Sequence, residues 1–128
     1  MTAGHARLLI GGVVLAGVMS CSGPGDTSPP PPTGSNKTVD VYTIEQTFSS
    51  DLVTISVGDT VRWNFNKAQD GLGHNVRFSP RPAGTPTDIG TAANPETSGS
   101  VSRVFRTRGT FDYVCDLHGG MTGEVVVQ

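Results

Sequence analysis

The fold of this chain is set by the stretch Thr110-Phe-Asp-Tyr-Val-Cys115-Asp-Leu-His118-Gly-Gly-Met121-Thr-Gly123-Glu-Val-Val-Val127. Both ends are rich in Val, Phe, Tyr and Thr, which is typical of β-strands, and a glycine-containing loop joins them. Alternation along the first strand places Phe111, Tyr113 and Cys115 on one face. We therefore expect a strand that ends at a buried cysteine, a tight loop, and a second strand.

The loop after this cysteine carries a histidine and a methionine. Cys115, His118 and Met121 offer a thiolate, an imidazole and a thioether, which are soft ligands that favour copper over harder cations. A further ligand lies upstream, where His74 follows a Gly-Leu-Gly loop and opens a strand-like run. Two histidines, a cysteine and a methionine are the ligands of a type 1 (blue) copper site. The loop glycines, Gly119 and Gly120, allow the backbone to turn tightly between two of these ligands.

The rest of the chain after Asn36 also predicts strands, and it shows no helical periodicity. Short runs of β-branched and aromatic residues alternate with Gly, Asp, Asn and Pro. The expected strands cover residues 39–44, 52–57, 60–65, 74–78, 99–105, 110–115 and 123–127. About 90 residues of this kind bury enough apolar surface to fold independently as a two-sheet sandwich, with Trp63, Phe65, Phe111 and Tyr113 in its core. Because His74 begins one strand and Cys115 ends another, both can lie at the same end of the sandwich.

Two further features of this domain have open interpretations. Residues 79–98 show no periodicity, and we expect a surface crossover whose position relative to the metal ligands the sequence does not determine. Asp116 is a lone carboxylate on a loop, which we expect to be solvated. Nothing near the ligands resembles acid–base catalytic machinery.

The charge and cysteine content exclude some classes of protein. The 128 residues carry a formal net charge of −2, which argues against a nucleic-acid-binding protein. Arg103, Arg106 and Arg108 form a small cationic group, which we interpret as solvated surface, with steering of an acidic partner as the alternative. The two cysteines, Cys21 and Cys115, both have other expected roles, so we predict no disulfide.

The N-terminal sequence predicts a targeting segment. An apolar run from Leu8 to Met19, of about 12 residues, is shorter than the ~20 that span a bilayer but suits a secretory signal. It leads into Val18-Met19-Ser20-Cys21, which resembles a bacterial lipobox with an unusual methionine in the middle position. The resemblance implies cleavage before Cys21 and lipid on its thiol; an ordinary signal peptide is the alternative.

We divide the chain into three parts on these grounds. Residues 1–20 are the expected signal peptide, and residues 21–35 are a lipidated cysteine and a proline-rich tether. The tether contains Pro29-Pro30-Pro31-Pro32, which favours an extended polyproline II conformation and cannot build a core. Residues 36–128 are the expected copper-binding domain. The protein would therefore be exported and lipid-anchored at an extracytoplasmic membrane face.

From about Val39 to Gln128 the chain resembles the plastocyanin/azurin family of small blue copper proteins, the cupredoxins. The resemblance is carried by the segments Val57-Gly58-Asp59-Thr60-Val61-Arg62-Trp63, Gly73-His74-Asn75-Val76 and Phe111 to Gly123. The Cys-x2-His-x2-Met spacing is similar to the short ligand loop of amicyanin-type members. The resemblance implies a Greek-key β-sandwich or barrel of about seven to eight strands that binds one copper ion.

The resemblance also implies individual roles. His74, Cys115 and His118 would form a trigonal plane around copper, with Met121 as a long axial ligand. Asn75 would tie the two ligand segments together by hydrogen bonds, and the Gly73 carbonyl would approach the metal from the opposite side. His118 would be partly exposed, inside a flat patch with few charges to which Leu72 contributes.

The predicted function is one-electron transfer between extracytoplasmic redox proteins, with a donor and an acceptor that dock near His118. The alternative is copper capture or delivery without electron transfer. An enzyme is disfavoured because a copper oxidase or nitrite reductase needs further copper centres, and after signal cleavage only His74 and His118 remain as histidines. We expect a monomer, held at the membrane through the lipid on Cys21.

Overall fold

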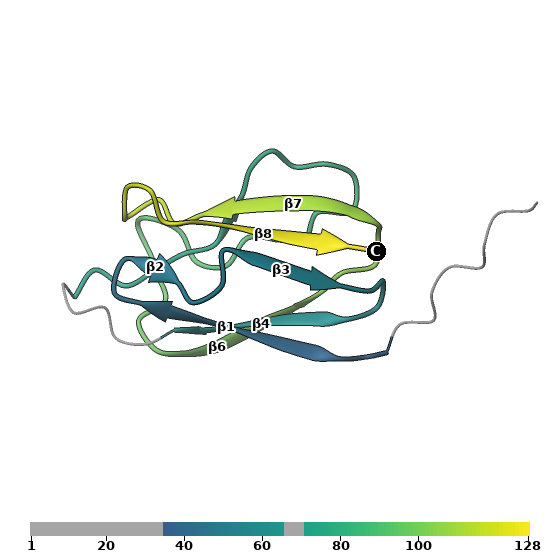
Figure 1. The fold of residues 1–128 in the computed structure, drawn as a ribbon. Coiled ribbons are helices and arrows are strands. Elements are labelled where there is room, and N and C mark those ends of the chain that lie inside the picture. Colours follow the sequence, from purple (N-terminus) through teal and green to yellow (C-terminus); the bar gives the residue numbers. More distant parts are fainter. Residues whose placement is uncertain (1–34, 66–70) are drawn as a thin grey trace, which may run out of the picture.

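Alternating apolar and polar residues give strands with one buried face, and here they form two four-stranded sheets packed face to face (Figure 1). The structure is a computed structural model that describes residues 35–65 and 71–128. Its strands are β1 (Thr38–Ile44), β2 (Thr47–Phe48), β3 (Leu52–Ile55), β4 (Thr60–Phe65), β5 (Arg77–Phe78), β6 (Gly99–Val104), β7 (Gly109–Val114) and β8 (Thr122–Val127). The predicted all-β sandwich is confirmed.

The strand order is β2-β1-β4-β6 in one sheet and β3-β8-β7-β5 in the other. β1 runs parallel to β4 and β3 runs parallel to β8, and the other pairings are antiparallel. β4 and β7 therefore end, and β8 begins, at one end of the sandwich, which we call the site end. The opposite end, where β1 and β4 begin and β8 finishes, is the base end (Figure 1).

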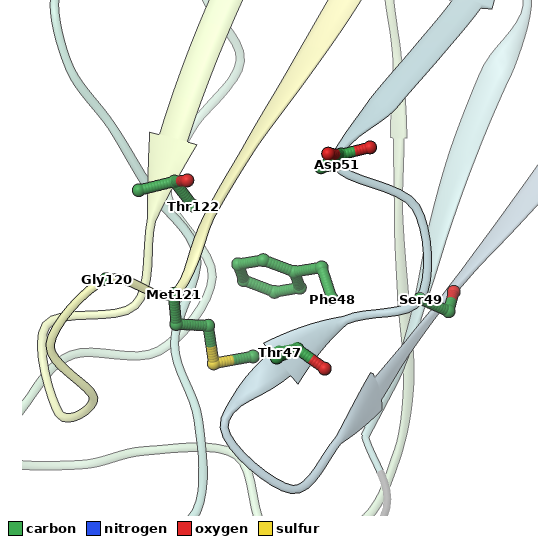
Figure 2. A pocket seen from close by; sticks show the side chains of 7 residues that line it. All are labelled: Thr47, Phe48, Ser49, Asp51, Gly120, Met121 and Thr122. Carbon is green, nitrogen blue, oxygen red and sulfur yellow. The ribbon is translucent and has the colours of Figure 1, made fainter.

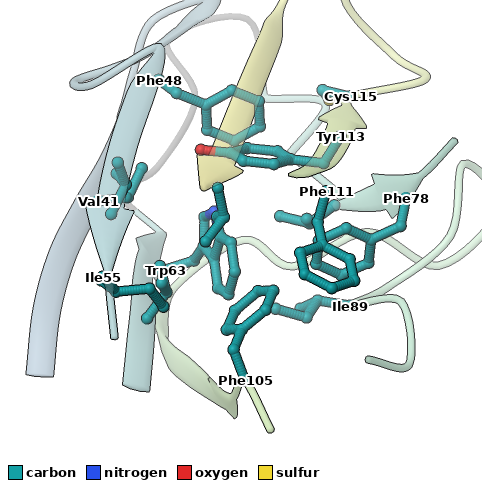
Figure 3. Packing of buried hydrophobic residues seen from close by; sticks show 14 of the residues in the cluster. Val41, Phe48, Ile55, Trp63, Phe78, Ile89, Phe105, Phe111, Tyr113 and Cys115 are labelled. Carbon is teal, nitrogen blue, oxygen red and sulfur yellow. The ribbon is translucent and has the colours of Figure 1, made fainter. Parts of the chain in front are cut away.

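The core lies between the sheets and is built from the inward-facing residues of each strand (Figure 3). The expected core residues Trp63, Phe65, Phe111 and Tyr113 are all at most 3% exposed, which confirms that prediction. Trp63 meets Tyr113 edge to face, with ring centroids 5.4 Å apart and an interplanar angle of 88°. Such pairs stabilise the core beyond the burial of their area.

Two strands differ from the prediction. β2 was missed because its two residues, Thr47 and Phe48, are too few to show periodicity. The strand expected at 74–78 is regular only over Arg77–Phe78, where it pairs with β7. His74 and Val76 instead form isolated bridges to Glu96 and Ile89, because the segment at 89–96 lies alongside them.

A buried carboxylate closes the base end. Asp59 is 2% exposed and accepts hydrogen bonds from the Ser35 hydroxyl (2.8 Å), the Lys37 amide (2.9 Å) and the Ser56 amide (3.0 Å). The bond from Ser56, followed by that from Ser35, lowers the pKa of Asp59 below its ordinary value. These contacts hold the start of the domain against the turn between β3 and β4.

The predicted signal peptide, Cys21 and almost all of the predicted tether lie outside the described residues. Within 35–65 and 71–128 no helix is long and apolar enough to cross a membrane. Cys115, the cysteine that the structure describes, is buried and has a free thiol.

Candidate metal centre

Three buried side chains from two distant segments meet at the site end. His74 precedes β5, and Cys115 and His118 lie in the loop between β7 and β8. Their potential ligand atoms all lie within 4.8 Å of one another, and the Cys115 Sγ is 3.4 Å from the His118 Nδ1. The three residues are at most 4% exposed. No other group of at least three His, Cys, Asp or Glu residues is so arranged in the described part of the chain.

The distances and chemistry of this group fit one transition-metal ion. Such an ion binds thiolate sulfur at about 2.3 Å and imidazole nitrogen at about 2.0–2.1 Å, so a sulfur and a nitrogen that share it lie no more than about 4.4 Å apart. The observed group needs little rearrangement to reach that limit. One thiolate and two imidazoles suit copper in both of its common oxidation states, because sulfur favours Cu(I) and nitrogen suits Cu(II).

The loop between β7 and β8 is closed by its own backbone. The Cys115 amide donates to the Met121 carbonyl (2.9 Å), and the Met121 amide donates to the His118 carbonyl (3.2 Å). Gly120 adopts a φ of 84°, a conformation that side chains disfavour. The short loop therefore returns directly to β8, with Cys115 and His118 on a common side.

Met121 stands at the end of this loop and is 1% exposed. Figure 2 shows its side chain directed toward Thr47 of β2, next to the ring of Phe48, at a surface hollow of about 420 Å³. β2, the strand that the sequence did not reveal, thus covers the methionine side of the loop. Met121 is held by the same backbone bonds as Cys115 and His118.

His74 is held in place by the segment that precedes β6. Its amide donates to the Glu96 carbonyl (2.9 Å), and the Glu96 amide donates back to the His74 carbonyl (2.8 Å). Gly73 allows this approach: its φ is 76°, and a Cβ there would lie 2.8 Å from the Glu96 carbonyl oxygen. The sequence left the position of residues 79–98 open, and the structure places their C-terminal part directly beside the candidate metal centre.

Asn75 connects the two ligand segments. It is 1% exposed, its Nδ2 donates to Asp116 Oδ2 (2.9 Å), and its Oδ1 accepts from the Asp116 amide (2.8 Å). The residues after His74 and after Cys115 are therefore joined by two hydrogen bonds. Contacts of this kind, behind the ligands, fix ligand orientation in metal sites.

Asp116 is exposed to solvent, as expected, but it is not a lone carboxylate. Besides Asn75, Asp116 contacts Arg77, whose Nε lies 2.7 Å from Oδ1, and its side chain is 27% exposed. The hydrogen bond from Asn75, together with Arg77, lowers the pKa of Asp116 below its ordinary value, so the group is ionised at neutral pH. In the sequence, only its position next to Cys115 indicated that Asp116 could belong to the site. Its contact with Arg77 could not be predicted, because that contact depends on the β5–β7 pairing. No sequence feature marked Glu96 as part of the site, because it contacts His74 through its backbone.

His118 is more enclosed than expected. It is 4% exposed rather than partly exposed, and its ring lies 4.8 Å from that of His74. The nearby residues are nevertheless open to solvent: Leu72 is 52% exposed, and Gly119 and Gly120 are exposed. An exposed apolar side chain thus lies two residues before His74, and two exposed glycines follow His118.

Similarity to known proteins agrees with this geometry. A sequence profile of the copper-binding proteins of the plastocyanin/azurin family matches residues 36–128. Amicyanin-alpha of Methylorubrum extorquens is 35% identical over 98 residues, which cover 76% of this chain and 75% of that protein.

Solved structures of amicyanin are similar to the whole domain. Amicyanin from Paracoccus versutus is 26% identical, with a TM-score of 0.55 over 71% of this chain and 81% of that one. A reduced Cu(I) form of an amicyanin variant gives a TM-score of 0.56 at 26% identity, over 71% of this chain and 82% of that one. With a profile that spans most of the chain and a fold shared with amicyanin, this protein belongs to the plastocyanin/azurin family of copper-binding proteins, the cupredoxins.

Proposed function

We propose that this protein is a type 1 (blue) copper protein, tethered to a membrane, that carries single electrons between redox proteins outside the cytoplasm. The observation that carries the proposal is the convergence of His74, Cys115 and His118 at one buried point. Bound copper supplies a one-electron couple, and the chain supplies the ligands and their fixed geometry. In this proposal the three residues would hold the ion, Met121 would be a further, weaker ligand, and the Gly73 carbonyl would lie close to it.

Burial and hydrogen bonding favour electron transfer over copper delivery. A delivery protein must release its ion to a partner, which requires donors that a competing ligand can reach. Here the three donors are at most 4% exposed. Their segments are also tied together through Asn75 and Asp116 and braced by Glu96. Such a site resists rearrangement when the metal changes charge, and this property lowers the barrier to electron transfer.

The surface near His118 suits brief contact with redox partners. Leu72 supplies an exposed apolar group, and Gly119 and Gly120 leave the backbone open. Small apolar contacts of this kind fit the weak, transient interfaces of electron-transfer proteins. We therefore place donor and acceptor docking here and propose that the protein acts as a monomer.

The base end is the side that would face the lipid. Ser35 and Lys37, where the domain begins, are bonded to Asp59 at this end. Arg106 and Arg108 are exposed in the turn before β7, whose first residue pairs with the end of β8. These cations suit an anionic headgroup layer. A tether that joins at the base end would leave the site end free, and this placement argues against a role of Arg106 and Arg108 in steering partners to His118.

The copper function is tested by adding Cu(II) to the purified protein. We expect an intense blue absorption that ascorbate bleaches and reoxidation restores over repeated cycles. Cys115→Ser should abolish the colour, whereas Met121→Leu should keep it and shift the spectrum and reduction potential. A colourless Cu(I) form that resists oxidation, or copper that passes to a competing chelator within minutes, would instead support delivery.

The tether is tested separately in a bacterial host that lipidates exported proteins. The wild-type protein should fractionate with membranes and carry a diacylglycerol mass on Cys21. The Cys21→Ser variant should lose both properties and still turn blue with copper. A wild-type protein found entirely in the soluble extracytoplasmic fraction would contradict the anchor without affecting the copper site.

A further inference from the structure

An ion pair lies immediately behind the cysteine of the metal centre. Asp116 follows Cys115 in sequence, and Arg77 reaches it from β5, with 2.7 Å between Nε and Oδ1. The two side chains are 44% (Arg77) and 27% (Asp116) exposed, so water screens the pair only in part. Arg77 stands opposite Val114 in the β5–β7 ladder, which aligns it with the end of β7.

Hydrogen bonds hold the Asp116 carboxylate in place next to the two ligand segments. Its Oδ2 accepts from Asn75 Nδ2 (2.9 Å), its Oδ1 accepts from Arg77, and its backbone amide donates to Asn75 Oδ1 (2.8 Å). Asn75 is itself 1% exposed and follows His74. A negative charge is therefore held at a defined position one residue from the thiolate.

The two charges of this pair have opposite effects on a nearby redox centre. Oxidation of Cu(I) to Cu(II) adds one positive charge, so a fixed carboxylate stabilises the oxidised state and lowers the reduction potential. A guanidinium disfavours the oxidised state and raises the potential. Because Arg77 touches the carboxylate on its exposed side, it offsets much of the effect of Asp116.

We propose that the Arg77–Asp116 pair sets the reduction potential of the copper centre, with Asp116 lowering it and Arg77 restoring it. This inference rests on the proposed copper function. Asp116 acts by its charge beside the ligand, and Arg77 acts by its opposite charge next to that carboxylate. Neither residue binds the metal.

The test is a set of reduction potentials measured on the copper-loaded protein. Arg77→Gln leaves the carboxylate uncompensated and should lower the potential, whereas Asp116→Asn leaves the guanidinium alone and should raise it. Each change should shift the Cu(II)/Cu(I) ratio by about tenfold, the order expected for a unit charge that is only partly screened by water, which is about 59 mV for a one-electron couple. The double variant should return close to the wild-type value, and Arg77→Lys should retain it.

A second ion pair provides a matched control. Arg62 and Asp40 lie on β4 and β1 in the other sheet, with 2.6 Å between Nε and Oδ1 and side-chain exposures of 45% and 30%. Arg62→Gln should therefore leave the potential unchanged. The shift caused by Arg77→Gln should also shrink as salt is added, because salt screens partly exposed charges; a shift caused by loosened structure would not.

The outcomes separate this inference from the proposed function. A blue wild-type protein whose potential is unchanged in Arg77→Gln, or changes in the same direction in both single variants, overturns the inference alone. A wild-type protein that never forms the blue band overturns the proposed function and the inference together. Opposite shifts that cancel in the double variant support both.

Discussion

Tyr113 makes the stability of this domain sensitive to alkaline pH. Its ring is 0% exposed and packs against Trp63 and Phe48, with centroid separations of 5.4 Å and 4.8 Å. Burial raises the pKa of Tyr113 from its ordinary value of 10.0 to about 12. Above pH 10 the unfolded chain releases this proton and the folded protein does not, so the folded state loses stability as the pH rises from 10 toward 12.

The size of the loss follows from the pKa difference. Two pKa units at about 1.36 kcal/mol each correspond to about 2.7 kcal/mol once both states are ionised, and to about 2 kcal/mol by about pH 11.5. Below about pH 9 the group contributes no pH dependence, because its phenol is protonated in both states.

The assay is urea unfolding of the copper-free protein between about pH 9 and pH 11.5, followed by the fluorescence of Trp63, the single tryptophan. The matched variant is Tyr113→Phe, which keeps the ring and cannot ionise. All other titrating groups are shared, so the difference in unfolding free energy between the two proteins should move by about 2 kcal/mol in favour of the variant. A difference that stays constant across this range would refute the argument from burial.

Three further predictions concern packing, acid stability and copper affinity. Gly123→Ala would place a Cβ 2.7 Å from Tyr113 Cε2, and the overpacking should lower the free energy of unfolding by about 1–3 kcal/mol. In the same denaturation assay Gly119→Ala, whose Cβ would meet no atom within 4 Å, should have little effect, and equal losses would contradict the contact. Asp59→Asn should destabilise the protein at neutral pH, and the difference from wild type should disappear in acid. The reason is that the lowered pKa of Asp59 gives stability that is lost only as the pH falls through that pKa. A difference in denaturant titrations that does not depend on pH would contradict the role of the Asp59 charge. Asn75→Ala should weaken copper binding about 10–100-fold in competition with a chelator, and unchanged affinity would show that its bonds to Asp116 are dispensable.

Local pattern was enough to predict most strands and the apolar faces that they bury. Val61, Trp63 and Phe65 alternate with polar residues, and the alternation survives in β4 because a pleated strand sends successive side chains to opposite faces. The pattern failed where an element was too short or irregular to repeat. β2 has two residues, and the segment after His74 pairs through isolated bridges.

The ligand types were likewise readable from the chain, since Cys115, His118 and Met121 lie in one short loop. Their spacing alone predicts a soft-metal site, because the donors of a tight loop cannot lie far apart. That His74 joins Cys115 and His118 is a long-range contact, which the sequence allowed and the packing of β5 against β7 decides.

The sequence by itself thus determined the strand pattern, the types of metal-binding side chain and the family, because each of these follows from residues that are close together in the chain. Tertiary structure alone decided what surrounds those donors. Glu96 braces His74 through its backbone, and Arg77 reaches Asp116 across a strand pair. The physical reason is that these contacts depend on register between segments far apart in sequence, and that register is set by packing of the whole sandwich rather than by local preference.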